Sequence, residues 1–209
     1  MKPILLVGLG NPGEKYLNSR HNIGFNVLEA LAAKWQTANF EANKEKQGWQ
    51  ATKPGDPIVY LLKPLTFMND SGKAVQNYAD FYHIPLENIW VIHDDMDIPF
   101  GQIKIHRKLS GGGHNGVKSV IEHLRSQDFW RFRFGISRPQ PLDLNADGRI
   151  DSREWAIAKY DSADYVLADF DAEQAKTLPP IINKMIETIE TAIKEGPEKA
   201  ANFFNGKIA

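Results

Sequence analysis

The chain has 209 residues, of which 42% are hydrophobic and 24% charged, a composition that excludes a disordered or fibrous protein. Its 25 lysines and arginines are balanced by 26 aspartates and glutamates, which excludes a general attraction to nucleic acid or to an anionic membrane, so any RNA contact must come from a local patch. There is no cysteine, which excludes disulfides, thiol nucleophiles and thiolate metal sites.

The predicted elements alternate between strands and helices from the start of the chain. A short apolar run, ILLVGLG at residues 4–10, predicts a buried strand that ends in a glycine turn. Residues 22–34 carry apolar side chains at helical spacing. Residues 58–62 are the clearest strand of an alternating segment at 38–63, and residues 71–82 predict a helix that Pro85 ends. Met1 to Pro3 run directly into the first strand, so we expect no secretory signal.

The alternation continues after Pro85. We predict strands at 88–92, 102–106 and 129–136, a glycine loop at 110–116, SGGGHNG, and a helix at 117–124. Residues 139–164 read as an inserted loop segment with a helix at 152–159, and residues 171–205 as helix broken at Pro179-Pro180 and at Gly196-Pro197. This order predicts one α/β domain over residues 1–209, a twisted mixed β-sheet covered by helices on both faces.

Polar side chains follow several predicted strands, where open α/β sheets bind their ligands. These groups are Asn11 with Arg20-His21-Asn22, Phe67-Met68-Asn69, His93-Asp94-Asp95, and His114-Asn115 in the glycine loop. A histidine oriented by a carboxylate can take a proton from water, and asparagine amides can stabilise an oxyanion without adding charge. This inventory favours a hydrolase that acts on a neutral carbonyl through water, since neither Ser71 nor Ser110 lies in a G-x-S-x-G elbow.

Each of these residues also has an ordinary structural explanation. Asparagines after strands are typical turn formers and helix caps, and Asp94, Asp95 and Asp97 are compatible with a solvated turn or a metal site. Their joint position at strand ends is the stronger signal.

Five sequence blocks, in the same order, resemble the signature of bacterial-type peptidyl-tRNA hydrolases. They are GLGNPGEKYLNSRHNIGF, KPLTFMNDSGKAV, VIHDDMDIPFGQIKI, SGGGHNGVKSVIEHL and FWRFRFGISRP. The likeness covers most of residues 1–138 and resumes at 165–167 and 200–205. It implies an esterase that frees tRNA from peptidyl-tRNA, that contacts the acceptor stem and CCA end, and that needs no cofactor for catalysis. We expect no membrane partner, because no apolar run approaches the ~20 residues of a bilayer span. The absence of cysteine favours the cytoplasm, and we expect a monomer because no heptad or exposed apolar stripe indicates association.

The resemblance also implies roles for individual residues. His21 matches the general base and Asp94 its orienting carboxylate. Asn11, Asn69 and Asn115 match the asparagines that hold the peptide backbone, the terminal ribose and the catalytic water. Tyr16 and Met68 match positions that line the pocket. His114 belongs to the gating loop.

Two basic residues, Lys104 and Arg133, match positions that bind the 5′ phosphate of tRNA. A solvated basic strand is the alternative explanation. His106 stands where the family often has a second lysine, so we expect phosphate binding here to be weaker or more dependent on pH.

The inserted segment contains DLNADGRIDSRE at residues 143–154, a full match to an EF-hand calcium loop. The ligands would be Asp143, Asn145, Asp147, the carbonyl of Arg149, Asp151 and Glu154. Pro139 and Pro141 preclude a regular entering helix, and a lone loop of this kind would bind calcium weakly. A structural calcium site and an empty acidic surface loop therefore both remain open.

Three other functions are compatible with parts of the sequence. Gly8, Gly10 and Gly13 spell the G-x-G-x-x-G of dinucleotide-binding oxidoreductases, but Pro12 falls in the opening turn and no strand ends in an acid ~20 residues later. A metal-dependent hydrolase could use His93 with Asp94, Asp95 and Asp97. A non-catalytic RNA-binding module or calcium sensor is the third.

Overall fold

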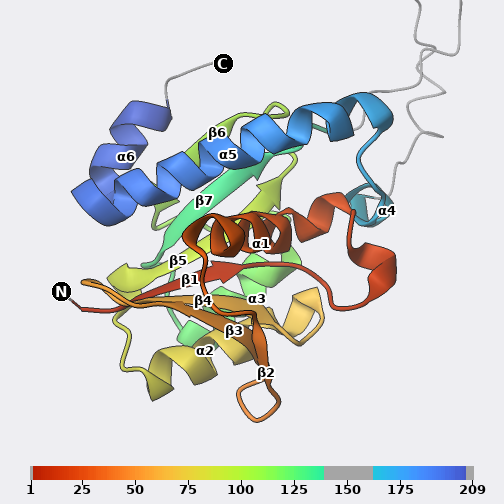
Figure 1. The fold of residues 1–209 in the computed structure, drawn as a ribbon. Helices are drawn as coiled ribbons and strands as arrows, with labels where there is room; N and C mark the ends of the chain where they lie inside the picture. Colours follow the sequence, from red (N-terminus) through yellow and green to blue (C-terminus); the bar gives the residue numbers. More distant parts are fainter. Residues whose placement is uncertain (1, 139–161, 206–209) are drawn as a thin grey trace, which may run out of the picture.

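The computed structural model describes residues 2–138 and 162–205. Within these ranges one mixed sheet of seven strands forms the centre of the molecule, in the order β2-β3-β4-β1-β5-β7-β6 (Figure 1). The strands are β1 (Ile4–Gly8), β2 (Glu41–Asn43), β3 (Gly48–Lys53), β4 (Val59–Pro64), β5 (Ile89–Asp95), β6 (Ile103–Arg107) and β7 (Trp130–Gly135). The neighbours β4, β1, β5 and β7 are parallel, whereas β2, β3 and β6 pair antiparallel.

Helices cover both faces of this sheet, as predicted (Figure 1). One face carries α1 (Ile23–Trp35), α4 (Ser162–Leu167), α5 (Ala172–Glu195) and α6 (Pro197–Phe204), and the other carries α2 (Ser71–Phe81) and α3 (Asn115–Leu124). Short 3₁₀ turns complete the chain: η1 (Glu14–Tyr16), η2 (Arg20–Asn22), η3 (Met68–Asp70) and η4 (Leu86–Asn88). Among the described helices, none is long and apolar enough to cross a membrane.

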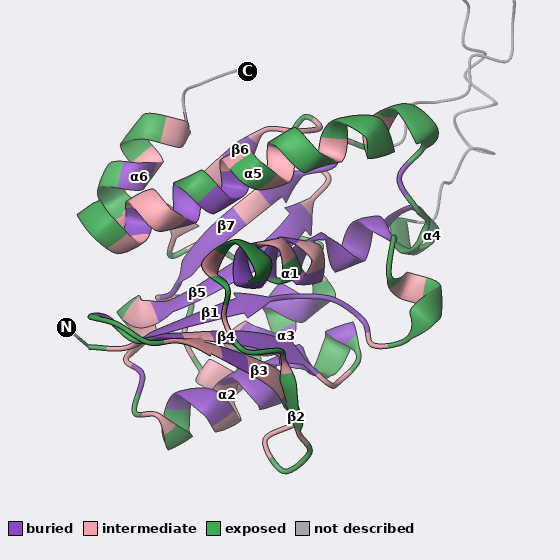
Figure 2. Cartoon of the chain, in the orientation of Figure 1, coloured by how far each residue is buried: buried purple, intermediate pink, exposed green. Residues whose placement is uncertain are grey.

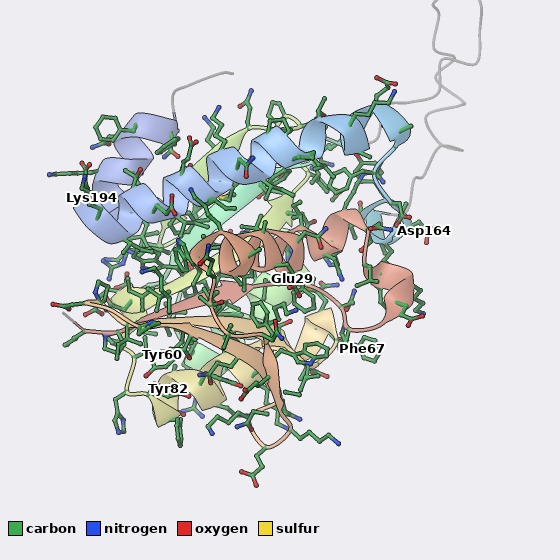
Figure 3. All side chains as sticks on the ribbon, in the orientation of Figure 1. Glu29, Tyr60, Phe67, Tyr82, Asp164 and Lys194 are labelled. Atoms are coloured by element: carbon green, nitrogen blue, oxygen red, sulfur yellow. The ribbon has the colours of Figure 1, made fainter. Side chains whose placement is uncertain are left out.

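The strands are buried because both faces of the sheet are covered, and Figure 2 shows the central strands in the colour of buried residues. Side chains of β1 alternate between two apolar clusters. Leu6 packs with α1 and α5, while Leu5 and Val7 pack with α2 and α3. On the α2 face, Tyr60 of β4 stacks on Tyr82 with ring centroids 3.9 Å apart (Figure 3). A continuous apolar run therefore predicted a covered strand correctly.

Two predicted boundaries were wrong. Strand β5 does not stop at Ile92 but continues to Asp95, because its last residues pair in register with β7. Helix α5 runs through Pro179-Pro180 without a break. Both prolines are exposed, so water can bond the backbone carbonyls that a missing proline N–H leaves free. The predicted break at Gly196 is confirmed.

The predicted helix at 152–159 and the EF-hand-like loop at 143–154 lie outside the described residues. The last three residues of the predicted insertion, 162–164, begin α4.

Close contact between α1 and β1 places η2 against the sheet. A Cβ atom on Gly8 would lie 2.3 Å from the carbonyl oxygen of Gly24, and a Cβ on Gly24 would lie 2.5 Å from the backbone nitrogen of Leu9. Only glycine permits backbones to approach this closely. The turn η2, which directly precedes α1, is thereby held beside the carboxyl end of β5.

Candidate active site

A cavity of about 650 Å³ lies at the carboxyl ends of the parallel strands. Its walls come from η2, η3, the end of β5, the glycine loop, β7 and α4. This is the edge of the sheet at which the polar side chains that follow the strands were predicted to lie. The cavity brings together residues from segments that are far apart in the chain.

His21 and Asp94 meet in the wall of this cavity. His21 Nδ1 lies 2.8 Å from Asp94 Oδ1, and both side chains are buried. His21 comes from η2 and Asp94 from the end of β5, so the close packing of α1 on the sheet creates the pair. Because a carboxylate can only accept, Nδ1 carries the proton and Nε2 carries the lone pair.

His114 is bound to the same carboxylate oxygen. Its Nε2 lies 3.0 Å from Asp94 Oδ1, and its Nδ1 accepts a bond from the backbone N–H of Val117 at 3.3 Å, which caps the start of α3. These two partners fix the neutral ring with its proton on Nε2. The His21 and His114 rings lie 4.7 Å apart. The glycine loop is thus tied directly to the carboxylate that orients His21.

Asp94 is ionised in this environment. Burial alone would raise its pKa, but the N–H groups of the two histidines, by electrostatic attraction and by hydrogen bonds, hold the pKa of Asp94 well below its usual range. The ligand atoms of His21, Asp94 and His114 all lie within 4.8 Å of one another, a spacing that metal sites also show. Here, however, Oδ1 accepts an N–H from each ring, so the three side chains form a hydrogen-bond network.

Asn22 was expected among the polar strand-end residues, but without a role of its own, and in the structure it holds Asn11 in place. Its Oδ1 accepts from the backbone N–H of Asn11 at 2.8 Å, and its Nδ2 donates to the carbonyl of Asn11 at 2.9 Å. Asn11 Oδ1 in turn accepts from the N–H of Met68 at 2.8 Å. The amide oxygen of Asn11 is therefore occupied, and its NH₂ group is the end left to face the cavity.

The remaining predicted pocket residues divide into two groups. Met68, Asn69, His114 and Asn115 line the cavity, and both Asn69 and Asn115 are exposed. Tyr16, although described, is not among the residues that line it. It lies at the end of η1, where its carbonyl accepts from the hydroxyl of Ser19.

The two predicted phosphate-binding residues face each other across the sheet edge. Lys104 of β6 pairs in register with Arg133 of β7, and the next pair on the same face of the sheet is His106 with Arg131. Arg133 Nε donates to Asp95 Oδ2 at 2.8 Å, and Lys104 Nζ donates to the carbonyl of Asn205. The four basic side chains form one cluster. Within it, Lys104 and Arg133 each donate a hydrogen bond to another group of the protein.

Two further buried residues line the cavity: His93, which the sequence offered only as a strand-end histidine or metal ligand, and Arg131, which no sequence pattern indicated. His93 Nδ1 donates to the carbonyl of Asp94 at 2.7 Å. Burial, and then His114, lower the pKa of His93 well below its ordinary value, so the ring is neutral. Arg131 donates to the carbonyls of Leu109 and Ser110 and so anchors the glycine loop. Both residues lie within buried strands, and only their spatial partners reveal these contacts.

The residues proposed for a dinucleotide site do not form one. The glycine motif leads into the 3₁₀ turn η1, and not into the long helix whose N-terminus would bind a pyrophosphate. Gly10 is required by packing, because a Cβ there would lie 2.7 Å from the ring of Phe25.

The acidic residues of the alternative metal hydrolase are bonded elsewhere. Asp95 pairs with Arg133, and Asp97 pairs with Arg138. The side chains of His93, Asp95 and Asp97 are not part of the metal-compatible group found within the described residues.

Comparisons with known proteins agree with this geometry. Residues 5–209 match the model of the family described as peptidyl-tRNA hydrolase. The chain is 42% identical to the peptidyl-tRNA hydrolase of Desulfitobacterium hafniense, over 96% of this chain and 98% of the relative. It is 39% identical to that of Nostoc punctiforme, over 98% and 91%. The crystal structure of peptidyl-tRNA hydrolase from Acinetobacter baumannii is 28% identical, covers 98% of this chain and 95% of its own, and has a TM-score of 0.83. The chain therefore belongs to the peptidyl-tRNA hydrolase family.

Proposed function

We propose that this protein hydrolyses the ester bond that joins a peptide, or an N-blocked amino acid, to the 3′ ribose of tRNA. The observation that carries the proposal is the 2.8 Å contact between His21 Nδ1 and Asp94 Oδ1 in the wall of the cavity. Within the described part of the chain, His21 Nε2 forms no hydrogen bond, so this nitrogen is available as a base.

The reaction begins when His21 Nε2 takes a proton from a water molecule. The water oxygen attacks the ester carbonyl carbon, forming a new C–O bond and a tetrahedral oxyanion. The bond from carbon to the 3′ oxygen then breaks, and the imidazolium returns its proton to that oxygen. Asp94 keeps the ring in the required tautomer and stabilises the imidazolium while it exists.

Amide groups around the cavity stabilise the oxyanion and hold the substrate. The NH₂ group of Asn11 is directed there because its oxygen already accepts from Met68. Asn69 and Asn115 line the same cavity and are assigned to the terminal ribose and the catalytic water. A donor aimed at the oxyanion is worth about 3 kcal/mol of barrier.

The tRNA is bound through its acceptor stem and CCA end, with the 5′ phosphate at Lys104 and Arg133. The pairing of these residues across β6 and β7 supports this assignment. Such contacts position RNA without reading its sequence. A formal net charge of –1 means that this local cluster must supply the attraction.

The test is incubation of the protein with an N-acetyl-aminoacyl-tRNA. Wild type should release the acyl group, His21→Ala should release almost none, and excess chelator should make little difference because no step uses a metal. Free aminoacyl-tRNA should be a poorer substrate, since its protonated amine replaces a neutral amide. Binding of tRNA without acyl release would instead identify a non-catalytic RNA-binding module.

We also propose that the protein acts as a cytoplasmic monomer and that the loop at Asp143–Glu154 binds calcium in a structural role. The loop supplies the oxygen ligands that calcium prefers. Calorimetric titration of the whole protein should show calcium uptake that Asp143→Ala removes. No uptake, or uptake unchanged in the variant, rules the site out.

A further inference from the structure

Arg20, the residue before His21, is buried and bonded on several sides. Its Nη1 donates to the carbonyl of Asp169 at 2.7 Å and to those of Tyr165 and Ala168 at 3.3 Å. Its Nη2 donates to Gln174 Oε1 at 3.1 Å. One guanidinium therefore joins η2 to the end of α4 and to the first turn of α5.

Among the described residues, no acidic side chain pairs with this charge. None of the ion pairs within residues 2–138 and 162–205 involves Arg20, and its buried Nε has no partner in those ranges. The rings of Tyr165 and Phe170 lie 4.2 and 5.5 Å from the guanidinium carbon. A buried charge is weak evidence of stabilisation, because desolvation costs as much as the contacts return. A rigid planar fork does, however, fix geometry between elements.

The backbone reinforces the same connection. The N–H of Arg20 donates to the carbonyl of Ala168 at 3.1 Å, and Ser19 forms an antiparallel bridge with Asp169. Each residue of η2 thus has its own anchor: Arg20 on α4 and α5, His21 on Asp94, and Asn22 on Asn11.

Helix α4, to which Arg20 is hydrogen-bonded, also forms part of the cavity wall. Val166 and Leu167 of α4 line the cavity that contains His21. The hydroxyl of Tyr165 donates to the carbonyl of Ile136 at 2.9 Å, which fastens α4 to the end of β7. The imidazole and this wall are consequently held by one side chain.

We infer that Arg20 is a positioning residue for His21: its bonds to α4 and α5 fix η2 so that the imidazole stays aligned with Asp94. The inference rests on the proposed function, in which His21 is the base. A small displacement of a reacting group can cost about a hundredfold in rate, so the effect should appear in the chemical step and not in substrate binding.

The test compares Arg20→Gln and Arg20→Lys with wild type in three measurements. These are the single-turnover rate and KM with N-acetyl-aminoacyl-tRNA, the melting temperature, and the tautomer of neutral His21 from ring ¹H–¹⁵N correlation spectra. Arg20→Gln should lower the rate about 10- to 100-fold with little change in KM. It should also raise the fraction of His21 protonated at Nε2. Arg20→Lys, which keeps the charge and one or two bonds, should lie between the two.

Tyr165→Phe is the matched control, because it removes a bond of α4 to β7 but leaves the ring beneath the guanidinium. It should lower the melting temperature while the rate and the tautomer stay near wild type. The inference requires both a slower rate and an altered tautomer in Arg20→Gln, so the absence of either overturns it. If that variant does not fold, Arg20→Lys is judged by the same criterion. A wild type without esterase activity would refute the proposed function, and the tautomer alone would then decide whether Arg20 positions the ring.

Discussion

A single oxygen of Asp94 accepts from two imidazoles, at 2.8 Å from His21 and 3.0 Å from His114. The resemblance to the family implied the first contact, and it placed His114 in the gating loop. Its bond to Asp94 could not be foreseen, because the direction of a side chain in a glycine loop depends on contacts made only in the folded chain.

His106 gives a prediction about pH. Burial, and then Arg133, Lys104 and Arg131, lower the pKa of His106, while Asp95 opposes them. The ring is therefore neutral at pH 7.5 and becomes charged only as pH falls through its lowered pKa. The ligand for the test is a deacylated acceptor-stem minihelix with a 5′ phosphate. Wild type should bind it more tightly than His106→Gln does, and this difference should be larger at pH 5.5 than at pH 7.5. Fluorescence anisotropy measures the dissociation constant of each protein at each pH.

Two controls separate this effect from others. The phosphate itself gains a proton near pH 6, but that change affects wild type and His106→Gln equally. A minihelix with a 5′ hydroxyl should show no difference between the two proteins. An equal pH dependence in wild type and variant would show that His106 does not contact the phosphate.

At the scale of the element, hydrophobic periodicity located β1, β4 to β7, α1 to α3 and the helical stretch that forms α5 and α6. It did not separate β2 from β3 within the alternating segment 38–63, and it missed the short elements η1–η4 and α4. It failed where tertiary contacts override local preference. Pairing with β7 extends β5 to Asp95, and packing of the second half of α5, at Met185, Ile186 and Ile189, carries that helix past its two prolines.

Gly24→Ala tests the contact between α1 and β1. Helix propensity alone predicts stabilisation by about 1 kcal/mol, but the new Cβ would lie 2.5 Å from the nitrogen of Leu9 and 2.7 Å from the carbonyl oxygen of Ile92. We expect the free energy of unfolding to fall by about 1–3 kcal/mol, with a loss of activity because η2 moves with α1. Urea denaturation measures the free energy of unfolding. Asn26→Ala, on a half-buried position of the same helix, should be neutral or stabilising, and a stabilised Gly24→Ala would refute the contact.

Pro180→Ala tests the helical assignment of α5. A proline inside a helix costs about 3 kcal/mol relative to alanine, partly offset by about 1 kcal/mol through the unfolded chain. We therefore expect the variant to raise the free energy of unfolding by about 2 kcal/mol, a gain that thermal denaturation would detect. Pro197→Ala is the control, because Pro197 begins α6, where proline is favoured, and it should not stabilise. Equal effects of the two substitutions would mean that Pro180 does not lie within a helix.

At the scale of the whole molecule, the rule that ligands bind at the carboxyl ends of parallel strands predicted where the site lies. Residues from η2, η3, β5 and the glycine loop do converge there. The supporting bonds were not predictable, because Arg20 reaches partners 145 to 154 positions away and Asn22 acts through the backbone of Asn11. Tyr16 shows the converse, since a matching motif position does not line the cavity.

The central claim is that two residues 73 positions apart act as one catalytic unit, and a double-mutant cycle tests it most directly. His21→Asn should lower the single-turnover rate on N-acetyl-aminoacyl-tRNA by about 10²- to 10⁴-fold. Asp94→Asn should also be slow, and the double variant should be no slower than His21→Asn, because removing either member disables both. Losses that multiply in the double variant, or a His21→Asn protein as fast as wild type, would contradict the account.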